Sequence, residues 1–444
     1  MINELNKEAF ELIKLVVTKP KEVPSERAEL VGSSKERGFT DLSDKVVGAA
    51  TEITTDHIGN TIAMFLVDEN GSVGFDETQF VKFKDLVKKA HSTEQLNPKV
   101  SLNFIERKFF DWVVDVYKKQ RAESNLFDYL ITQADTAVKI YTFFFPVLNL
   151  EIEQAFKVGN VEFTFFTKEY LDNLYTSLKG KDETMTEETF AQIFRKDFQG
   201  QVLAKVDVNA ERDKAEELAK QEAEIAVSVL KLYSESAVIP EKKTMFDLNY
   251  KLGYQVQSNF LTQKPNDSES LSINLKFNNY PSNYSQKLYN SAYESGLKVF
   301  SDYLLLRKND ELHDIIIQLI HLFGSAISNW DLHLRCVNLI TLLESLFLKE
   351  DEDYKMEQKT KARLSKALSN QHQEKERIKT VITTIYEVRH KMIHKGKRID
   401  FDTKILSEAQ IIMANLFLHL IDLNTRLNLT EKNKLIEILD QEKS

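Results

Sequence analysis

The spacing of hydrophobic residues changes along the chain. Before about residue 280, segments with helical spacing alternate with short runs of β-branched and aromatic residues, whereas after Tyr284 a period near 3.6 residues continues almost to the end. Proline is absent from that last stretch. The pattern predicts a multidomain α+β protein, with a mixed α/β region over residues 1–280 and an all-α helical bundle over residues 284–444.

In the N-terminal region the pattern predicts helices at Lys7 to Val17 and at Phe104 to Lys118, the second capped by Asn103. Turn dipeptides at Asn70-Gly71 and Gly159-Asn160 predict two hairpins. The predicted strands are Thr61 to Val67, Lys139 to Phe145, Leu148 to Phe156, Val161 to Phe166, Met245 to Gln255 and Leu271 to Phe277. One apolar stripe predicts a long helix from Ala210 to Tyr233.

In the C-terminal region every segment has helical periodicity, and short polar connections separate the segments. The predicted helices are Ser285 to Leu306, Leu312 to Ile327, Asp331 to Leu348, Met356 to Ser369, Lys375 to His394, Lys404 to Leu427 and Lys432 to Leu439. Short connections favour antiparallel neighbours, so we expect an antiparallel bundle.

Charge and cysteine content limit the classes of function. The net charge of −9 argues against a protein that coats nucleic acid over its whole surface, so any RNA contact must be local. The single cysteine, Cys336, leaves no internal disulfide and suits a reducing compartment. No signal-peptide pattern and no apolar run of about 20 residues is visible, so we expect a cytoplasmic protein without membrane contact.

Two histidines, His390 and His394, lie four residues apart on one predicted helix, and such a pair can bind zinc. The metalloprotease pattern places glutamate directly after the first histidine, whereas here Lys391 follows it, and no third ligand is evident. We therefore expect no metal. Phosphate-binding loops, dinucleotide-binding glycine motifs and nucleophilic serine elbows are absent from the sequence, so we expect no cofactor either.

Arg389 precedes His394 with four residues between them. A guanidinium group can bind a phosphate through paired hydrogen bonds, and an imidazole can carry a proton at neutral pH. General acid-base catalysis of this kind contributes about a hundredfold to ten-thousandfold in rate. The pair can therefore cleave RNA without a metal, although the spacing alone is common in proteins.

The surrounding residues make the pair more specific. The stretch from about Trp330 to Gly396 resembles the Apea-like HEPN family of bacterial proteins. The resemblance rests on three segments in the family's order, LLESLF at Leu342–Phe347, KARL at Lys361–Leu364 and IYEVRHKMIH at Ile385–His394. The family pattern is R-x(4 to 6)-H with a polar residue after the arginine, here His390. Many members carry glycine directly after the final histidine, whereas here Lys395 intervenes.

The resemblance implies a metal-independent endoribonuclease of anti-phage defence, a toxin or abortive-infection effector that leaves cyclic phosphate and 5'-hydroxyl ends. Its substrate would be RNA, with tRNA as one candidate. The implied catalytic residues are Arg389, His394 and His390. The candidate RNA-binding residues are Lys391, Lys395, Lys397 and Arg398, at the basic end of the same helix. Glu344, on a neighbouring helix, and Tyr386 are candidates to support the arginine.

Helix geometry favours a homodimer. Five residues of regular helix turn about 500°, so Arg389 and His394 lie about 140° apart around the axis. Two copies related by a two-fold axis through the bundle can form one composite cleft.

Two other functions stay open. One is a catalytically inactive HEPN dimerisation or binding module whose N-terminal region senses a ligand such as a phage-derived trigger. The other is a nucleotide sensor, which the lack of a phosphate loop disfavours.

Overall fold

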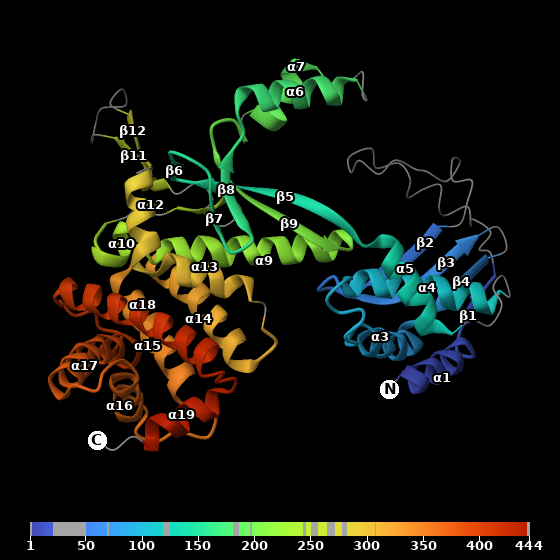
Figure 1. The fold of residues 1–444 in the computed structure, drawn as a ribbon. Coiled ribbons are helices and arrows are strands. Elements are labelled where there is room, and N and C mark those ends of the chain that lie inside the picture. Colours follow the sequence, from blue (N-terminus) through green and yellow to red (C-terminus); the bar gives the residue numbers. More distant parts are fainter. Residues whose placement is uncertain are drawn as a thin grey trace. The chain divides into compact units, whose positions relative to one another are not determined.

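The computed structural model describes residues 2–20, 50–68, 71–118, 125–180, 186–195, 198–242, 246–249, 256–263, 271–277, 282–306 and 308–441. The chain forms two compact units (Figure 1). Unit 1 consists of Met1–Tyr141 with Val208–Leu218, and unit 2 of Thr142–Asp207 with Ala219–Ser444. The predicted class, mixed α/β with a helical C-terminal half, is confirmed. Neither unit begins or ends near residue 280. That residues 284–444 form a separate functional domain therefore remains a prediction.

Unit 1 packs helices against an antiparallel sheet with the strand order β1-β4-β3-β2. Its strands are β1 (Val17–Lys19), β2 (Ala50–Thr55), β3 (Thr61–Asp68) and β4 (Gly71–Phe75). Its helices are α1 (Ile2–Ile13), α3 (Glu77–His91), α4 (Leu102–Tyr117) and α5 (Leu126–Ala137). The predicted hairpin between β3 and β4 is confirmed by the pairing of Asp68 with Gly71, while Asn70 lies outside the described residues.

Aromatic side chains fill the core of unit 1. Phe83 on α3 lies 5.3 Å, centroid to centroid, from both Phe75 and Phe109, and it also contacts Phe110. Trp112 on α4 is fully buried beside Phe109. Buried aromatic pairs of this kind stabilise a core beyond the area that they remove from water.

Two predicted element ends in unit 1 were wrong. The first helix begins at Ile2 and ends at Ile13, and β1 begins at Val17, because the buried stripe runs through Leu5, Ala9 and Leu12. The cap of α4 is Ser101, whose side chain accepts a hydrogen bond from the Phe104 backbone N–H, and not Asn103.

Unit 2 contains a sheet with the order β10-β5-β9-β8-β7 among the described strands. These are β5 (Lys139–Leu148), β7 (Phe156–Val158), β8 (Val161–Phe165), β9 (Val202–Ala210) and β10 (Asp247–Leu248). The predicted hairpin at Gly159-Asn160 is confirmed by the antiparallel pairing of β7 with β8. The predicted strand from Leu148 to Phe156 is instead interrupted, since Asn149 adopts a positive φ of 60° and β6 covers only Leu150–Ile152.

Outside the bundle, the remaining elements of unit 2 are short, apart from the helix α6 and the long helix described in the next paragraph. They are α6 (Lys168–Lys179), α7 (Glu187–Phe190), a π-helical turn (Ala191–Arg195), α10 (Glu235–Val238), β11 (Val256–Gln263), β12 (Leu271–Phe277) and β13 (Ser282–Tyr284). The predicted strand at Leu271 to Phe277 is confirmed. Most of the predicted strand from Met245 to Gln255 lies outside the described residues.

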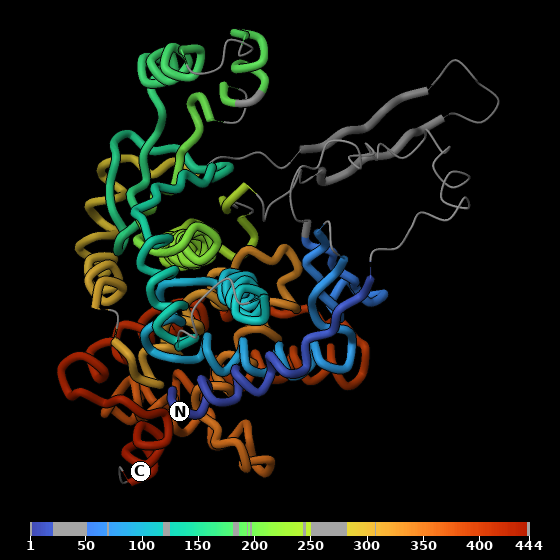
Figure 2. Tube along the Cα trace, turned by 90° about the vertical axis from the view of Figure 1, so that its right-hand side faces the viewer, coloured from blue at the N-terminus to red at the C-terminus, as the bar shows by residue number. Residues whose placement is uncertain are grey.

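The long helix α9 (Arg212–Lys231) contributes residues to both units and matches the predicted helix. It runs below the sheet of unit 2 in Figure 1 and is seen nearly end-on in Figure 2. Its contact with the helix α14 (Glu311–Ile327) is very close, because a Cβ added at Gly324 would lie 2.6 Å from the Cβ of Ser228. Glycine at residue 324 thus lets α14 approach α9.

The helical bundle follows the prediction closely. Its helices are α12 (Gln286–Ala292), α13 (Lys298–Leu305), α14 (Glu311–Ile327), α15 (Leu332–Phe347), α16 (Met356–Leu368), α17 (His372–Lys395), α18 (Thr403–Arg426) and α19 (Lys432–Gln441). No strand occurs in the described residues after Tyr284. The helix predicted from Ser285 to Leu306 is instead broken by a π-helical turn, Tyr293–Leu297, where Gly296 has φ of 118°.

Among the helices that the structure describes, α18 is long and apolar enough to cross a membrane by length and composition alone. Half of its most apolar stretch is buried in the bundle, where Leu416, Phe417 and Leu420 form part of the core. A core helix satisfies the same criterion, so α18 is weak support for membrane contact.

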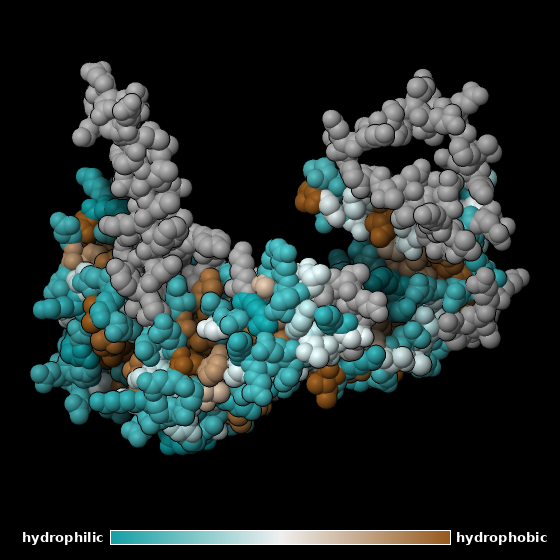
Figure 3. Space-filling view, turned by 90° about the horizontal axis from the view of Figure 1, so that it is seen from above, coloured by the Kyte–Doolittle hydropathy of each residue, from teal (hydrophilic) through white to brown (hydrophobic). Residues whose placement is uncertain are grey.

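The surface shown in Figure 3 is largely hydrophilic, and its hydrophobic residues form separate patches. Scattered exposed apolar side chains are normal in folded proteins and need no ligand to explain them.

Candidate functional site

The helix α17 carries the candidate catalytic residues in its last two turns. It ends at Lys395, and Gly396 follows with φ of 59°, in the left-handed region that glycine adopts most readily. The N–H of Gly396 donates to the Met392 carbonyl and the N–H of Lys397 to the Lys391 carbonyl. These two hydrogen bonds fix the end of the helix one residue after His394.

Arg389 is bound by a carboxylate from a neighbouring helix. Its Nη2 donates to Oε2 of Glu344 on α15 at 3.2 Å, and the hydroxyl of Tyr386 donates to the other oxygen, Oε1, at 3.1 Å. Glu344 is 12% exposed and Arg389 27%. The two residues proposed to support the arginine therefore lie beside it in space, one directly and one through the shared carboxylate.

A donor of Arg389 is left unused. Its Nε is buried and has no hydrogen-bond partner among the described residues. A buried donor without a partner costs about 1–3 kcal/mol, so a guanidinium in this state gains from an additional acceptor. A phosphate oxygen in the pocket can fill this role once the guanidinium turns its Nε toward the pocket.

The arginine lies in an open pocket of about 340 Å³ between α15, α16 and α17. The pocket is lined by Glu344, Met356, Glu357, Tyr386, Glu387, Arg389, His390 and Lys391. Two of its carboxylates have a cationic partner that balances their charge. Glu344 binds Arg389, and Glu357 accepts a hydrogen bond from Lys361 at 2.6 Å. Glu357 was not among the residues predicted from the sequence.

The structure brings together some of the candidate catalytic residues and separates others. His390 lines the pocket of Arg389, whereas His394 does not. The two imidazole rings lie 4.9 Å apart, centroid to centroid, and both residues are exposed. Arg389 and His394 thus have different surroundings in one chain, as the rotation of about 140° between them requires.

Burial raises the pKa of Tyr386 above its ordinary value. The phenol therefore remains protonated at neutral pH and can donate to Glu344. This hydrogen bond leaves Oε2 of Glu344 to Arg389 and restricts the rotation of the carboxylate. The position of the guanidinium is consequently defined from two directions.

The candidate RNA-binding residues differ in their surroundings. Lys395, the last residue of α17, and Lys397, just beyond it, are exposed, and Lys391 is half-buried at the pocket. Arg398 instead forms an ion pair with Asp331, the residue that caps α15. Asp331 neutralises part of the Arg398 charge before RNA binds, so the predicted role of Arg398 is the weakest of the four.

The segment after α17 is anchored to the start of α15 by a second contact that the sequence analysis missed. The Nε2 atom of His333 lies 2.9 Å from the Ile399 carbonyl oxygen, within hydrogen-bond distance. Asp331 is the first residue of the helix predicted from Asp331 to Leu348, but its partner Arg398 lies 67 residues further on. No local pattern predicts such a contact.

Groups of three or more His, Cys, Asp or Glu side chains that could hold a metal ion are not found among the described residues. Cys336 is a free thiol buried in α15, and burial raises its pKa to about 12. Such a thiol is protonated at neutral pH and is a poor nucleophile or metal ligand. The ionisable side chains that line the pocket of Arg389 include arginine, histidine, lysine and carboxylate groups.

Comparison of the chain with protein-family models, with curated proteins and with solved structures gave no match in any of the three.

Proposed function

We propose that this protein is a metal-independent endoribonuclease of the HEPN type, acting as a cytoplasmic defence toxin that cleaves RNA. The observation that carries the proposal is the state of Arg389. Its guanidinium is bound to Glu344 through one amino group, opens into a pocket beside His390, and keeps an unused donor. Such a group can bind a phosphodiester and stabilise the charge that develops on phosphorus.

The proposed reaction uses the 2'-hydroxyl of the RNA as the nucleophile. His394 accepts the proton of the 2'-hydroxyl. The 2'-oxygen then forms a bond to phosphorus, and the bond from phosphorus to the 5'-oxygen breaks. A second histidine protonates the leaving 5'-oxygen. The products are a 2',3'-cyclic phosphate and a 5'-hydroxyl, and Arg389 binds the phosphate oxygens throughout.

We further propose that the active form is a homodimer. Because His394 does not line the pocket of Arg389, one chain offers an incomplete set of groups. A two-fold axis near the end of α17 places Arg389 of one copy with His394 of the other in one cleft. In each copy His390 lies between Arg389 and His394 on the helix, and it then influences the geometry and protonation of both residues.

The test is cleavage of total cellular RNA by the purified protein in EDTA, with the new ends mapped. His394→Ala should lower the cleavage rate by at least about a hundredfold, which is the low end of a lost general acid-base group. His372→Ala, an exposed histidine at the other end of α17, is the matched control. Arg389→Lys should also fail, whereas Arg377→Lys on the same helix should not.

Failure to cleave RNA, or cleavage that EDTA abolishes, would contradict the proposal. A folded dimer without activity would favour the inactive binding module instead. DNA should survive the reaction because it lacks the attacking 2'-hydroxyl.

A further inference from the structure

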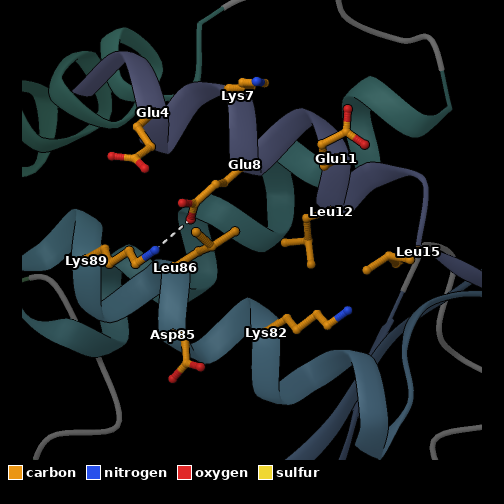
Figure 4. Close-up of a pocket in the computed structure, with 10 residues that line it drawn as sticks. All are labelled: Glu4, Lys7, Glu8, Glu11, Leu12, Leu15, Lys82, Asp85, Leu86 and Lys89. Carbon is orange, nitrogen blue, oxygen red and sulfur yellow. Dashed lines mark hydrogen bonds and ion pairs between the residues drawn. The ribbon is translucent and has the colours of Figure 1, made fainter. Parts of the chain in front are cut away.

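A groove of about 490 Å³ separates the helices α1 and α3 on the surface of unit 1 (Figure 4). Leu12 and Leu86, both buried, and half-buried Leu15 provide its apolar surface. In the close-up, Leu12 and Leu86 lie between the two helices while the charged side chains border them. The groove thus has an apolar floor and charged edges.

The two edges carry opposite charges, for a reason that is visible in the sequence. On α1, Glu4, Glu8 and Glu11 follow one another at spacings of four and three residues and so share one edge of the helix. On α3, Lys82 and Lys89 are seven residues apart and also share an edge. The α1 edge is therefore mainly acidic and the α3 edge mainly basic, although Lys7 and Asp85 also line the groove.

One ion pair crosses the groove. Nζ of Lys89 donates to Oε2 of Glu8 at 2.7 Å, with both side chains partly exposed. The acidic partner raises the pKa of Lys89 above its ordinary value. Glu4 and Lys82 have no ion pair with another described residue, and within the described part of the chain Glu11 pairs with Lys14 on its own helix. These charges remain available to an occupant.

The groove does not have the features of a small-molecule site. Such sites fix a ligand through several convergent polar groups, and none of the described groove residues has a buried polar atom without a partner. A second copy is also a poor occupant, because two facing grooves would leave both of them hollow. A single helix, which is convex, fits the space between two helices.

We propose that the groove between α1 and α3 binds one amphipathic helix of a partner protein. The apolar stripe of that helix packs on Leu12, Leu15 and Leu86, as in other helix-in-groove complexes. Its flank facing α1 carries lysine or arginine, and its flank facing α3 carries glutamate or aspartate. The proposal does not depend on ribonuclease activity.

The two flanks also determine the direction of the bound helix. Turning a helix end for end while its apolar stripe stays in the groove exchanges the flanks. A peptide with one basic and one acidic flank therefore binds in whichever direction matches the edges. A peptide whose flanks have the same charge meets repulsion at one edge in both directions.

The test measures fluorescence anisotropy of three labelled synthetic helices with the full-length protein in the absence of RNA. The peptides share one leucine stripe and carry mixed flanks, two acidic flanks or two basic flanks. The mixed-flank peptide should bind at least about tenfold more tightly than the other two. Its affinity should decrease as salt is added, because exposed charges are screened.

A variant with Glu4→Lys and Glu11→Lys makes both edges basic and should shift the preference to the peptide with two acidic flanks. The matched control, Glu94→Lys with Asp128→Lys, changes the net charge by the same amount at exposed residues of unit 1 that do not line the groove. Equal binding of all three peptides, no measurable binding of the mixed-flank peptide, or an equal shift in the control variant would overturn the proposal.

Discussion

Arg389 on α17 donates a hydrogen bond from Nη2 to Oε2 of Glu344 on α15, at 3.2 Å. This bond joins two helices of the bundle at the point where we place phosphate binding. The carboxylate thus has two effects, since it holds the guanidinium in place and also neutralises part of the charge that attracts phosphate. The balance between these effects can be measured by removing the carboxylate charge.

Glu344→Gln should lower the rate of RNA cleavage by about tenfold or more, because Arg389 loses its ionic partner and its fixed orientation. The free energy of unfolding should decrease by about 1–2 kcal/mol, as expected for a partly buried hydrogen bond to a charged group. Glu387→Gln, an exposed residue that lines the same pocket, is the control for stability. An unchanged cleavage rate in Glu344→Gln would show that Glu344 does not position the arginine.

The basic residues at and just beyond the end of α17 should contribute unequally to RNA binding. Lys395→Ala and Lys397→Ala should each reduce the slope of log affinity against log salt by about one, as expected for loss of one phosphate contact. Arg398→Ala should reduce the slope less than either lysine variant, because Asp331 already neutralises part of the Arg398 charge. Filter binding of RNA to a cleavage-deficient His394→Ala protein, between low and moderate salt, measures all three.

The bundle should lose stability in acid through Glu352. The Arg363 guanidinium, whose Nη1 lies 2.5 Å from Oε2 of Glu352, holds the pKa of that carboxyl well below its usual range. A lowered pKa in the folded state stabilises the protein above the unfolded pKa of about 4.3, and this stabilisation is lost as the pH falls below that value.

Urea unfolding at pH 7 and near pH 3 tests this contribution. Glu352→Gln should be less stable than the parent at pH 7 and should lose less stability between the two pH values. Glu437→Gln, an exposed residue on α19, should behave like the parent. Parallel losses in the parent and in Glu352→Gln would contradict the assignment.

Gly324→Ala should destabilise unit 2, although alanine normally stabilises a helix by about 1 kcal/mol relative to glycine. The added Cβ would lie 2.6 Å from the Cβ of Ser228 and 2.8 Å from its Cα, so the backbone of α9 or α14 must move. Overpacking of this kind costs about 1–3 kcal/mol. Thermal unfolding should show a lower Tm for Gly324→Ala and almost no change for Ser325→Ala, the exposed neighbour on α14.

The helices from Glu311 onward could be predicted to within a few residues because each buries one apolar stripe and ends in a polar connection. The break at Gly296 could not be predicted, since it depends on side chains from distant segments. A Cβ at that glycine would lie 3.0 Å from Leu418 and 3.1 Å from the Tyr233 hydroxyl. Conversely, no helix was predicted at Glu77–His91, although Phe80, Phe83 and Val87 have helical spacing.

The candidate site could likewise be predicted from the sequence only in part. The order of the motifs, and not any local pattern, suggested that Glu344 lies near Arg389. The ion pair between Arg398 and Asp331 is invisible in the sequence because one partner looks like a helix cap and the other like part of a basic helix end. Separation of His394 from the pocket was predictable, since it follows from the rotation per residue of a regular helix.

The close contact between α9 and α14 limits where recombination could exchange the N-terminal region of this chain for another. A junction near residue 284 would remove α9 and leave the surface of α14 around Gly324 without the side chain of Ser228 and without Glu224, which lies 3.6 Å from His321. A junction just before Ala219 would retain that surface, since the rest of α9 stays with unit 2. Inheritance of the bundle as a folded unit therefore requires that most of α9 is transferred with it.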